Sequence, residues 1–163
     1  MDLATLHDVS DLLYREGAYL DEQRWDDWIA LFTDDCEYWL PAWDGDHETT
    51  GDPKAEVSLI YYNRRSMLED RIARIRSGLS AASTPLPRTW HLVGNVRVGE
   101  FEGEMLPVLA QWQSRAYKHQ QTETFYGRCE YRLVSIEGAW RIRRKKITLI
   151  NDVINTVLDV YNL

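Results

Sequence analysis

Cysteine is scarce in this sequence, and the two copies are not arranged as a pair. Cys36 and Cys129 are the only cysteines among the 163 residues, and no Cys-x-x-Cys, Cys-x-His or Cys-x-x-His pattern occurs. A disulfide framework or a Cys/His-ligated iron–sulfur cluster would require such patterns. We therefore expect two separate, reduced thiols.

Long hydrophobic runs are also missing. No apolar stretch approaches the ~20 residues that a membrane-spanning helix needs. The opening segment MDLATLHDVSDLLYREG carries acidic residues where a signal peptide would have a basic start and an apolar centre. The net charge of −7 argues against nucleic acid or an anionic membrane as the main partner. We expect a soluble cytoplasmic protein that binds neither.

The motifs of common active sites are absent as well. There is no glycine-rich phosphate loop, no GxGxxG and no G-x-S-x-G turn. The four histidines, His7, His47, His91 and His119, lie far apart, and none has a second metal ligand at short spacing. The sequence therefore predicts no catalytic, cofactor-binding or metal-binding residue on this chain.

Apolar and aromatic residues, in contrast, are plentiful. Hydrophobic residues make up 44% of the chain, and seven tryptophans and nine tyrosines are among them. This composition is typical of a globular protein, and 163 residues suffice for one domain with a substantial core. With no internal repeat or linker, we expect residues 1–163 to form a single domain.

The first half of the sequence reads as helices around short strands. Apolar residues at helical spacing predict one helix from Leu6 to Leu20 and a second from Trp25 to Phe32, with Asp21 as the N-cap of the second.

Asp34 and Asp35 are expected in a turn, followed by strands over 36–40 and 57–62 on either side of a polar loop. Ser66 and Glu69 are spaced as a capping box for a third helix, with Leu68, Ile72, Ile75 and Leu79 on its apolar face.

The second half reads as a sheet. Alternation of buried and polar residues predicts strands at about 89–98, 105–118, 122–136 and 139–150. Gly103 and Gly138 fall where hairpin turns are needed. Helices followed by an antiparallel meander indicate an α+β domain, in which N-terminal helices pack against a curved sheet to form a cone. The apolar tail, 151–163, is expected to dock on it.

A few residues have a functional interpretation beside a structural one. His91 could act as a general base, but a base needs an orienting partner, so a hydrogen-bonded structural histidine is favoured. Asp34 and Asp35 could form a carboxylate pair. Five tyrosines, Tyr14, Tyr38, Tyr61, Tyr62 and Tyr126, could line a pocket, although core or interface positions are the commoner use of such residues.

The basic run Arg141 to Lys146 has two interpretations as well. On a strand its side chains divide between two faces, so nucleic-acid binding is disfavoured. Cross-strand pairing with acids such as Glu123 and Glu130 is one account, and contact with an acidic partner protein is the other, compatible one.

Five segments, in order, resemble the β subunits of aromatic-ring-hydroxylating dioxygenases and together span nearly the whole chain. They are LYREGAYLDEQRWDDWIALFTDDCEYWLPAW, DPKAEVSLIYYNRRSMLEDRIARIRSG, RTWHLVGNV, FYGRCEYRL and WRIRRKKITLINDVINTVLDVYNL. The closing LINDVINTVLDVY is most similar to the branch that acts on benzoate, anthranilate or salicylate.

The resemblance implies a cone-shaped α+β fold like that of nuclear transport factor 2 and scytalone dehydratase, in an assembly of three α and three β chains. In that family the α subunit carries the Rieske [2Fe–2S] cluster and the mononuclear Fe(II), and the β subunit is mainly structural. The alternative is a stand-alone dehydratase or isomerase of the same fold, which would use a His and an Asp in its cavity.

Aromatic residues in the strand-rich half exceed what one face of a small core needs. Some of them are therefore expected to face another subunit. They are Trp112, Tyr117, Phe125, Tyr126, Tyr131 and Trp140.

Overall fold

The computed structural model describes residues 3–163, which form helices, a six-stranded sheet and two short 3-10 turns. In chain order the elements are α1 (Leu3–Asp21), α2 (Trp25–Ile29), β1 (Phe32–Pro41), β2 (Ser58–Tyr62), α3 (Arg65–Arg76), the 3-10 turn Ala81–Ser83, β3 (Arg88–Val98), β4 (Leu106–Lys118), β5 (Gln121–Ile136), β6 (Ala139–Leu149) and the 3-10 turn Val160–Asn162. Within this part of the chain no helix is both long and apolar enough to cross a membrane.

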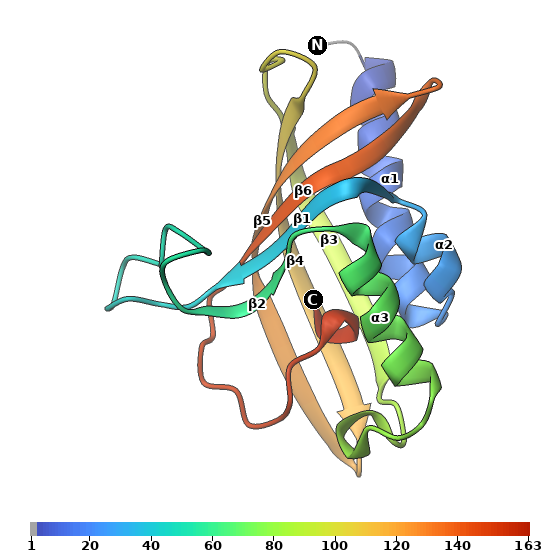
Figure 1. Ribbon diagram of the computed structural model, residues 1–163, viewed down its shortest axis with the longest axis vertical. Helices are drawn as coiled ribbons and strands as arrows, with labels where there is room; N and C mark the ends of the chain where they lie inside the picture. The colour runs from blue at the N-terminus through green and yellow to red at the C-terminus, as the bar shows by residue number, and fades with distance from the viewer. Residues whose placement is uncertain (1–2) are drawn as a thin grey trace.

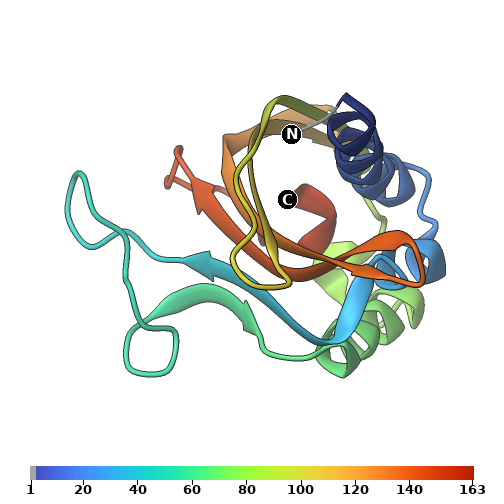
Figure 2. The ribbon, with the colours of Figure 1, turned by 90° about the horizontal axis from the view of Figure 1, so that it is seen from above.

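The sheet has the strand order β2-β1-β6-β5-β4-β3, and β1 and β6 are its one parallel pair. It curls strongly around the C-terminal segment, and the helices lie on its open side, with α1 against β3 and α3 against β1 (Figures 1 and 2). The predicted α+β architecture, with N-terminal helices against a curved, mainly antiparallel sheet, is confirmed.

Strand alternation builds the core. On β4 the side chains from Val108 to Ala116 are buried at every second position, and Trp112 and Ser114 are among them, as the sequence pattern predicts. The neighbouring strand β5 contributes Phe125 and Tyr131 to the core in the same way. Trp112, Phe125 and Tyr131 are therefore core residues, which leaves Tyr117, Tyr126 and Trp140 as the candidates to face another subunit.

The hairpins use left-handed backbone, with glycine at some positions only. Gly138, with φ of +79°, closes the β5–β6 hairpin, and Gly103, with φ of +65°, lies in the β3–β4 connection, as predicted. His119 and Gln120 make the β4–β5 turn at φ of +52° and +62°. Glycine is the residue usually found in such a turn. Because this turn contains none, a search of the sequence for glycine does not predict it.

The second helix is shorter than its spacing predicts. α2 ends at Ile29, while Phe32 begins β1 and pairs with Ile142 of β6. The predicted turn at Asp34 and Asp35 is also wrong, because both residues lie within β1. Asp21 is not an N-cap: α2 begins after Arg24, whose side chain caps nothing. Strand pairing and burial at Phe32 override the local helical spacing here.

The third helix differs from prediction at both ends. α3 begins at Arg65, so Ser66 and Glu69 form no capping box, and Glu69 instead accepts a hydrogen bond from Arg65. Leu68, Ile72 and Ile75 are buried as predicted, but Leu79 is 90% exposed. Gly78, at φ of +68°, adopts the left-handed conformation that commonly ends a helix, which removes Leu79 from the apolar face.

Candidate functional site

His91 has a carboxylate partner in the structure. Its Nδ1 lies 2.6 Å from Oδ1 of Asp21, and its backbone N–H donates to Oδ2 of the same residue at 2.9 Å. The hydroxyl of Thr89 donates to Asp21 as well. The expectation that His91 lacks an acid to orient it is therefore wrong. Asp21 ends α1 and His91 lies on β3, so the fold joins residues that are 70 positions apart.

Close packing of α1 on β3 makes this contact possible. A Cβ added at Gly17 would lie 3.0 Å from the Cβ of His91, so a larger residue there would push the helix away. Burial alone would raise the pKa of Asp21. The hydrogen bonds from His91 and Thr89, together with the charge of His91, outweigh burial, and the pKa of Asp21 lies below its usual value.

A second buried polar cluster lies beside the first. Nζ of Lys145 is 2.7 Å from Glu16, and the hydroxyl of Tyr131 donates to the other Glu16 oxygen at 3.0 Å. The Lys145 ammonium also lies 5.4 Å from the ring centre of Tyr38. Burial is the main cause that raises the pKa of Tyr131 well above its usual value, and the interactions with Cys129 and Glu16 act in the same direction. Glu16, Lys145 and Tyr131 are therefore paired with one another inside the core, whereas the Tyr38 hydroxyl has no hydrogen-bond partner among residues 3–163.

Both clusters border a very small cavity. The space of about 10 Å³ is lined by residues that include Glu16, His91, Trp112, Lys145 and Leu163. One water molecule needs roughly 10–15 Å³, and small-molecule sites commonly measure about 300–1,000 Å³. The structure thus has a His–Asp pair of the kind the dehydratase or isomerase alternative requires, but no room for an organic substrate beside it.

The C-terminal segment fills the hollow of the sheet, as Figure 2 shows. Val160, Tyr161, Asn162 and Leu163 are all buried, so the predicted docking of the tail is confirmed for its end, whereas Val153 and Val157 are 76% and 57% exposed. Asp159, with 2% of its side chain exposed, anchors the segment by an ion pair with Arg71.

Three further hydrogen bonds hold this segment in place. Asp159 accepts from the Val160 N–H, the hydroxyl groups of Tyr161 and Ser83 lie 3.2 Å apart, and Ser114 donates to the carbonyl of Asn162.

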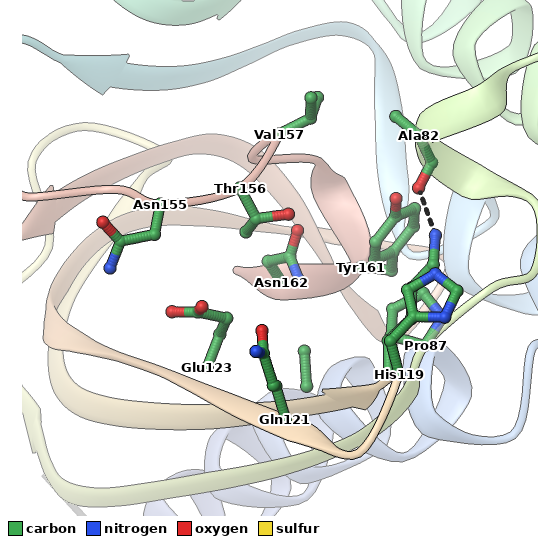
Figure 3. Close-up of a pocket in the computed structure, with 12 residues that line it drawn as sticks. Ala82, Pro87, His119, Gln121, Glu123, Asn155, Thr156, Val157, Tyr161 and Asn162 are labelled. Carbon is green, nitrogen blue, oxygen red and sulfur yellow. Dashed lines mark hydrogen bonds between the residues drawn. The ribbon is translucent and has the colours of Figure 1, made fainter.

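A second cavity, of about 230 Å³, opens at the end of the β4–β5 hairpin (Figure 3). Its lining is mostly polar and comes from the hairpin and the C-terminal segment; Lys118 donates to the carbonyl of Ala82 at 3.0 Å. His119 and Glu123 lie on opposite sides of it, as Figure 3 shows, and do not form an acid–base pair.

The other candidate residues do not converge. Asp34 pairs with Arg65, and Asp35 accepts from Thr33 and pairs with Arg143. The hydrogen bond from Thr33 is the largest of the effects that lower the pKa of Asp35, and these outweigh burial. The two aspartates are thus ion-paired separately and make no carboxylate pair.

The five tyrosines are dispersed between core and surface. Tyr38 is fully buried, Tyr14 and Tyr126 are about half exposed, and Tyr61 donates to Glu37. None of the five lines the cavity beside His91 or the cavity at the β4–β5 hairpin.

The basic run divides between two faces, as predicted. Lys145 points into the core, while Arg144 pairs with Glu37 and Lys146 lies 3.9 Å from Glu130. The predicted pairing with Glu130 is confirmed. Glu123 makes no ion pair with a residue in the range 3–163 and lines the cavity at the β4–β5 hairpin instead.

Cys36 and Cys129 are buried, free thiols, as predicted. Burial is the main cause that raises the pKa of each to about 12. Across residues 3–163, no group of three or more His, Cys, Asp or Glu side chains is arranged to hold a metal ion.

A family model described as ring-hydroxylating β subunit matches residues 15–156. The small subunit of anthranilate 1,2-dioxygenase from Acinetobacter baylyi is 43% identical over 156 residues, which cover 95% of each chain. The crystal structure of the benzoate 1,2-dioxygenase β subunit from Burkholderia mallei superposes with a TM-score of 0.80 at 32% identity, covering 100% of this chain and 98% of that one.

Two more distant structures from Novosphingobium aromaticivorans share the fold alone. A candidate scytalone dehydratase superposes with a TM-score of 0.68 at 15% identity, covering 90% of this chain and 85% of that one. A nuclear-transport-factor-2-like protein superposes with a TM-score of 0.64 at 14% identity, covering 94% and 89%. The predicted cone-fold class is thereby confirmed.

Proposed function

Since the chain belongs to the family of ring-hydroxylating dioxygenase β subunits, matched over residues 15–156, we propose that its part in the dioxygenase is structural. It contributes no catalytic, cofactor-binding or metal-binding residue. The Rieske [2Fe–2S] cluster and the mononuclear Fe(II) that the reaction needs are held by an α partner, and the β chain alone is inactive.

The observation that carries this proposal is the filled cone. His91, the member of the His91–Asp21 pair that lines a cavity, borders a space of about 10 Å³, and Leu163 of the buried C-terminal segment is part of the same lining. A general base must come within hydrogen-bond reach of its substrate. Because only a water-sized molecule fits there, the pair serves to join α1 to β3 and not to perform chemistry on an aromatic ring.

The ligands that the two iron groups require also support their placement on the α partner. Rieske clusters take two cysteines and two histidines, and non-haem iron takes two histidines and a carboxylate. Cys36 and Cys129 are buried thiols without a histidine at short spacing, so neither group fits residues 3–163.

We propose an assembly of three α and three β chains in the cytoplasm, with β–β as well as α–β contacts. Of the aromatic residues predicted to face another subunit, Tyr117 and Tyr126 are 39% and 44% exposed, and Trp140 is half-buried near Phe101. Exposed aromatic side chains of this kind favour subunit contacts.

For the substrate, we propose an aromatic ring that carries a carboxylate. The relatives named above are parts of dioxygenases for anthranilate and benzoate, both aromatic carboxylates. Because the α partner holds the iron in this proposal, it also selects the ring.

Co-expression with its α subunit tests the proposal. The chain purified alone should be colourless, contain no stoichiometric iron after chelation and show no turnover. Co-expressed, it should purify in one larger complex that oxidises an aromatic carboxylate. Stoichiometric iron on the isolated chain, or dehydratase or isomerase activity of a stable monomer, would contradict the structural role.

A further inference from the structure

The convex side of β3, β4 and β5 is an exposed sheet face rich in apolar side chains. Alternation that buries every second residue turns the others outward, and these include Trp90, Leu92, Leu109, Tyr117 and Tyr126, which are 39–52% exposed. We call this surface the outer sheet face.

The same face carries four exposed arginines: Arg88, Arg97, Arg115 and Arg128. None of them forms an ion pair with any residue in the range 3–163. Arg88 lies 4.8 Å from the ring centre of Tyr117, and Arg115 lies 5.7 Å from that of Trp90. On a chain of net charge −7 this is a concentrated positive surface whose charges lack partners within the described chain.

A projecting arm, residues 42–57, carries the opposite charge. Five carboxylates and one lysine give it a formal charge of −4. Asp44, Asp46 and Glu48 at its tip are exposed, and no acid of the arm forms an ion pair with another of the residues that the structure describes. Figures 1 and 2 show the arm standing away from the body of the molecule.

The arm is ordered by its own hydrogen bonds. The Asp44 N–H donates to the Glu48 carbonyl at 2.8 Å, and Thr50 donates to the Val57 carbonyl at 2.8 Å. Trp43 donates from its indole N–H to the carbonyl of Leu149, which fixes the base of the arm to the sheet. A preorganised loop loses little conformational entropy when it binds.

Within one molecule the arm stands away from the body and does not lie on the outer sheet face (Figures 1 and 2). The arm connects β1 and β2, whereas the outer sheet face lies on β3 to β5, and β2 and β3 are opposite ends of the sheet. We propose that the acidic arm of one copy of this chain docks on the outer sheet face of a second copy. Exposed Val57 and Leu59, at the arm's base, supply apolar contact area to match the aromatic side chains.

Such a contact joins two different surfaces and is therefore heterologous. Repeated between copies, it generates a closed ring when the rotation closes, as the proposed three-β arrangement requires, and an open filament when it does not. This inference rests on the proposed function, in which the chain is a structural subunit with β–β contacts. It adds which two surfaces make those contacts.

Charge reversal on the full-length chain tests the contact, with mass measured by light scattering at several concentrations. Arg115→Glu with Arg128→Glu on the sheet, or Asp46→Lys with Glu48→Lys on the arm, should each weaken self-association by at least about tenfold, because like charges then face each other. Combining the four changes should restore much of it. Raised salt should weaken the unaltered contact.

Arg74→Glu and Asp70→Lys on α3 are matched controls, since both residues are exposed and lie outside the two surfaces; they should leave the mass unchanged. A monomeric unaltered chain, or equal masses for all variants, would overturn the inference.

The same variants co-expressed with the α subunit separate the two claims. Failure of the unaltered chain to bind α contradicts the proposed function. Loss of α binding in the sheet variants, with self-association intact, assigns the outer sheet face to α and overturns the inference alone.

Discussion

Lys145 and Glu16 form an ion pair in the centre of the core, with 3% of each side chain exposed. Removing one partner of a buried pair leaves an uncompensated charge, which costs more than the pair itself contributes. Lys145→Met should therefore lower the free energy of unfolding by about 3–5 kcal/mol, measured by urea denaturation.

Adding Glu16→Gln to Lys145→Met provides the control. The double variant removes both charges and keeps an oxygen to accept the hydrogen bond from Tyr131, so it should recover much of the lost stability. A double variant as unstable as Lys145→Met would show that packing of the lysine stem, and not charge, dominates.

Asp21 should make stability depend on pH in the acid range. Its pKa is lowered in the folded protein from the ordinary 3.8, so its contribution is fully present above that value and is lost as the pH falls through the lower folded-state pKa. Asp21→Asn should flatten the decline of unfolding free energy below about pH 4, measured by denaturation at several pH values.

Asp70→Asn, at an exposed site on α3, is the matched control and should leave the slope as it is. An unchanged slope in Asp21→Asn would mean that the hydrogen bonds to His91 and Thr89 do not favour the ionised carboxylate.

At this scale the sequence shows which residues carry chemistry but not which of them meet. His91 stands out as a lone histidine, and Asp21 fits a capping position, yet they are joined only when α1 packs on β3 through Gly17. No local spacing encodes a contact across 70 positions. The nearest signal is the small residue in α1, which permits a close approach.

At the scale of elements, the C-terminal segment 159–163 acts as a plug for the cone. Arg71 of α3 neutralises Asp159 at the entrance of this segment. Arg71→Ala would leave the buried carboxylate unpaired, at a cost of about 3 kcal/mol, so the segment should undock before the rest of the chain unfolds. Hydrogen exchange should show faster exchange at Val160 to Leu163, with little change in β4 and β5.

Arg74→Ala is the matched control on the same helix, because Arg74 is exposed. Equal protection of the segment in both variants would show that Tyr161, Ser114 and apolar packing hold the plug without the ion pair.

The elements themselves were predictable where their periodicity is long. β4 and the buried face of α3 follow from alternation and helical spacing alone. The errors fall at the boundaries of elements. Phe32 continues a helical pattern in the sequence but lies in β1, where it pairs with β6. The β4–β5 turn consists of His119 and Gln120, whereas glycine is the residue that usually indicates such a turn. Tertiary pairing decides such positions, and a single sequence contains no direct record of it.

At the scale of the whole molecule, the chain's own residues fill the interior of the cone. The interior holds the chain's own C-terminal residues and two polar clusters. Further charged and aromatic side chains lie on the outer surface. An exterior suited to partners, around an interior closed to substrates, is the physical basis for assigning this chain to assembly.

The turnover of an assembled dioxygenase that carries an altered β chain tests this assignment most directly. His91→Ala, with Asp21→Asn as a second variant in case the first assembles poorly, disrupts the His–Asp pair that a dehydratase or isomerase of this fold would use. Complexes with the normal mass should be compared by kcat per iron on an aromatic carboxylate. Because a structural pair touches no substrate, kcat per iron should stay within about twofold of the unaltered complex. A loss of about a hundredfold or more in a normally assembled complex, the scale of a missing general base, would contradict the account.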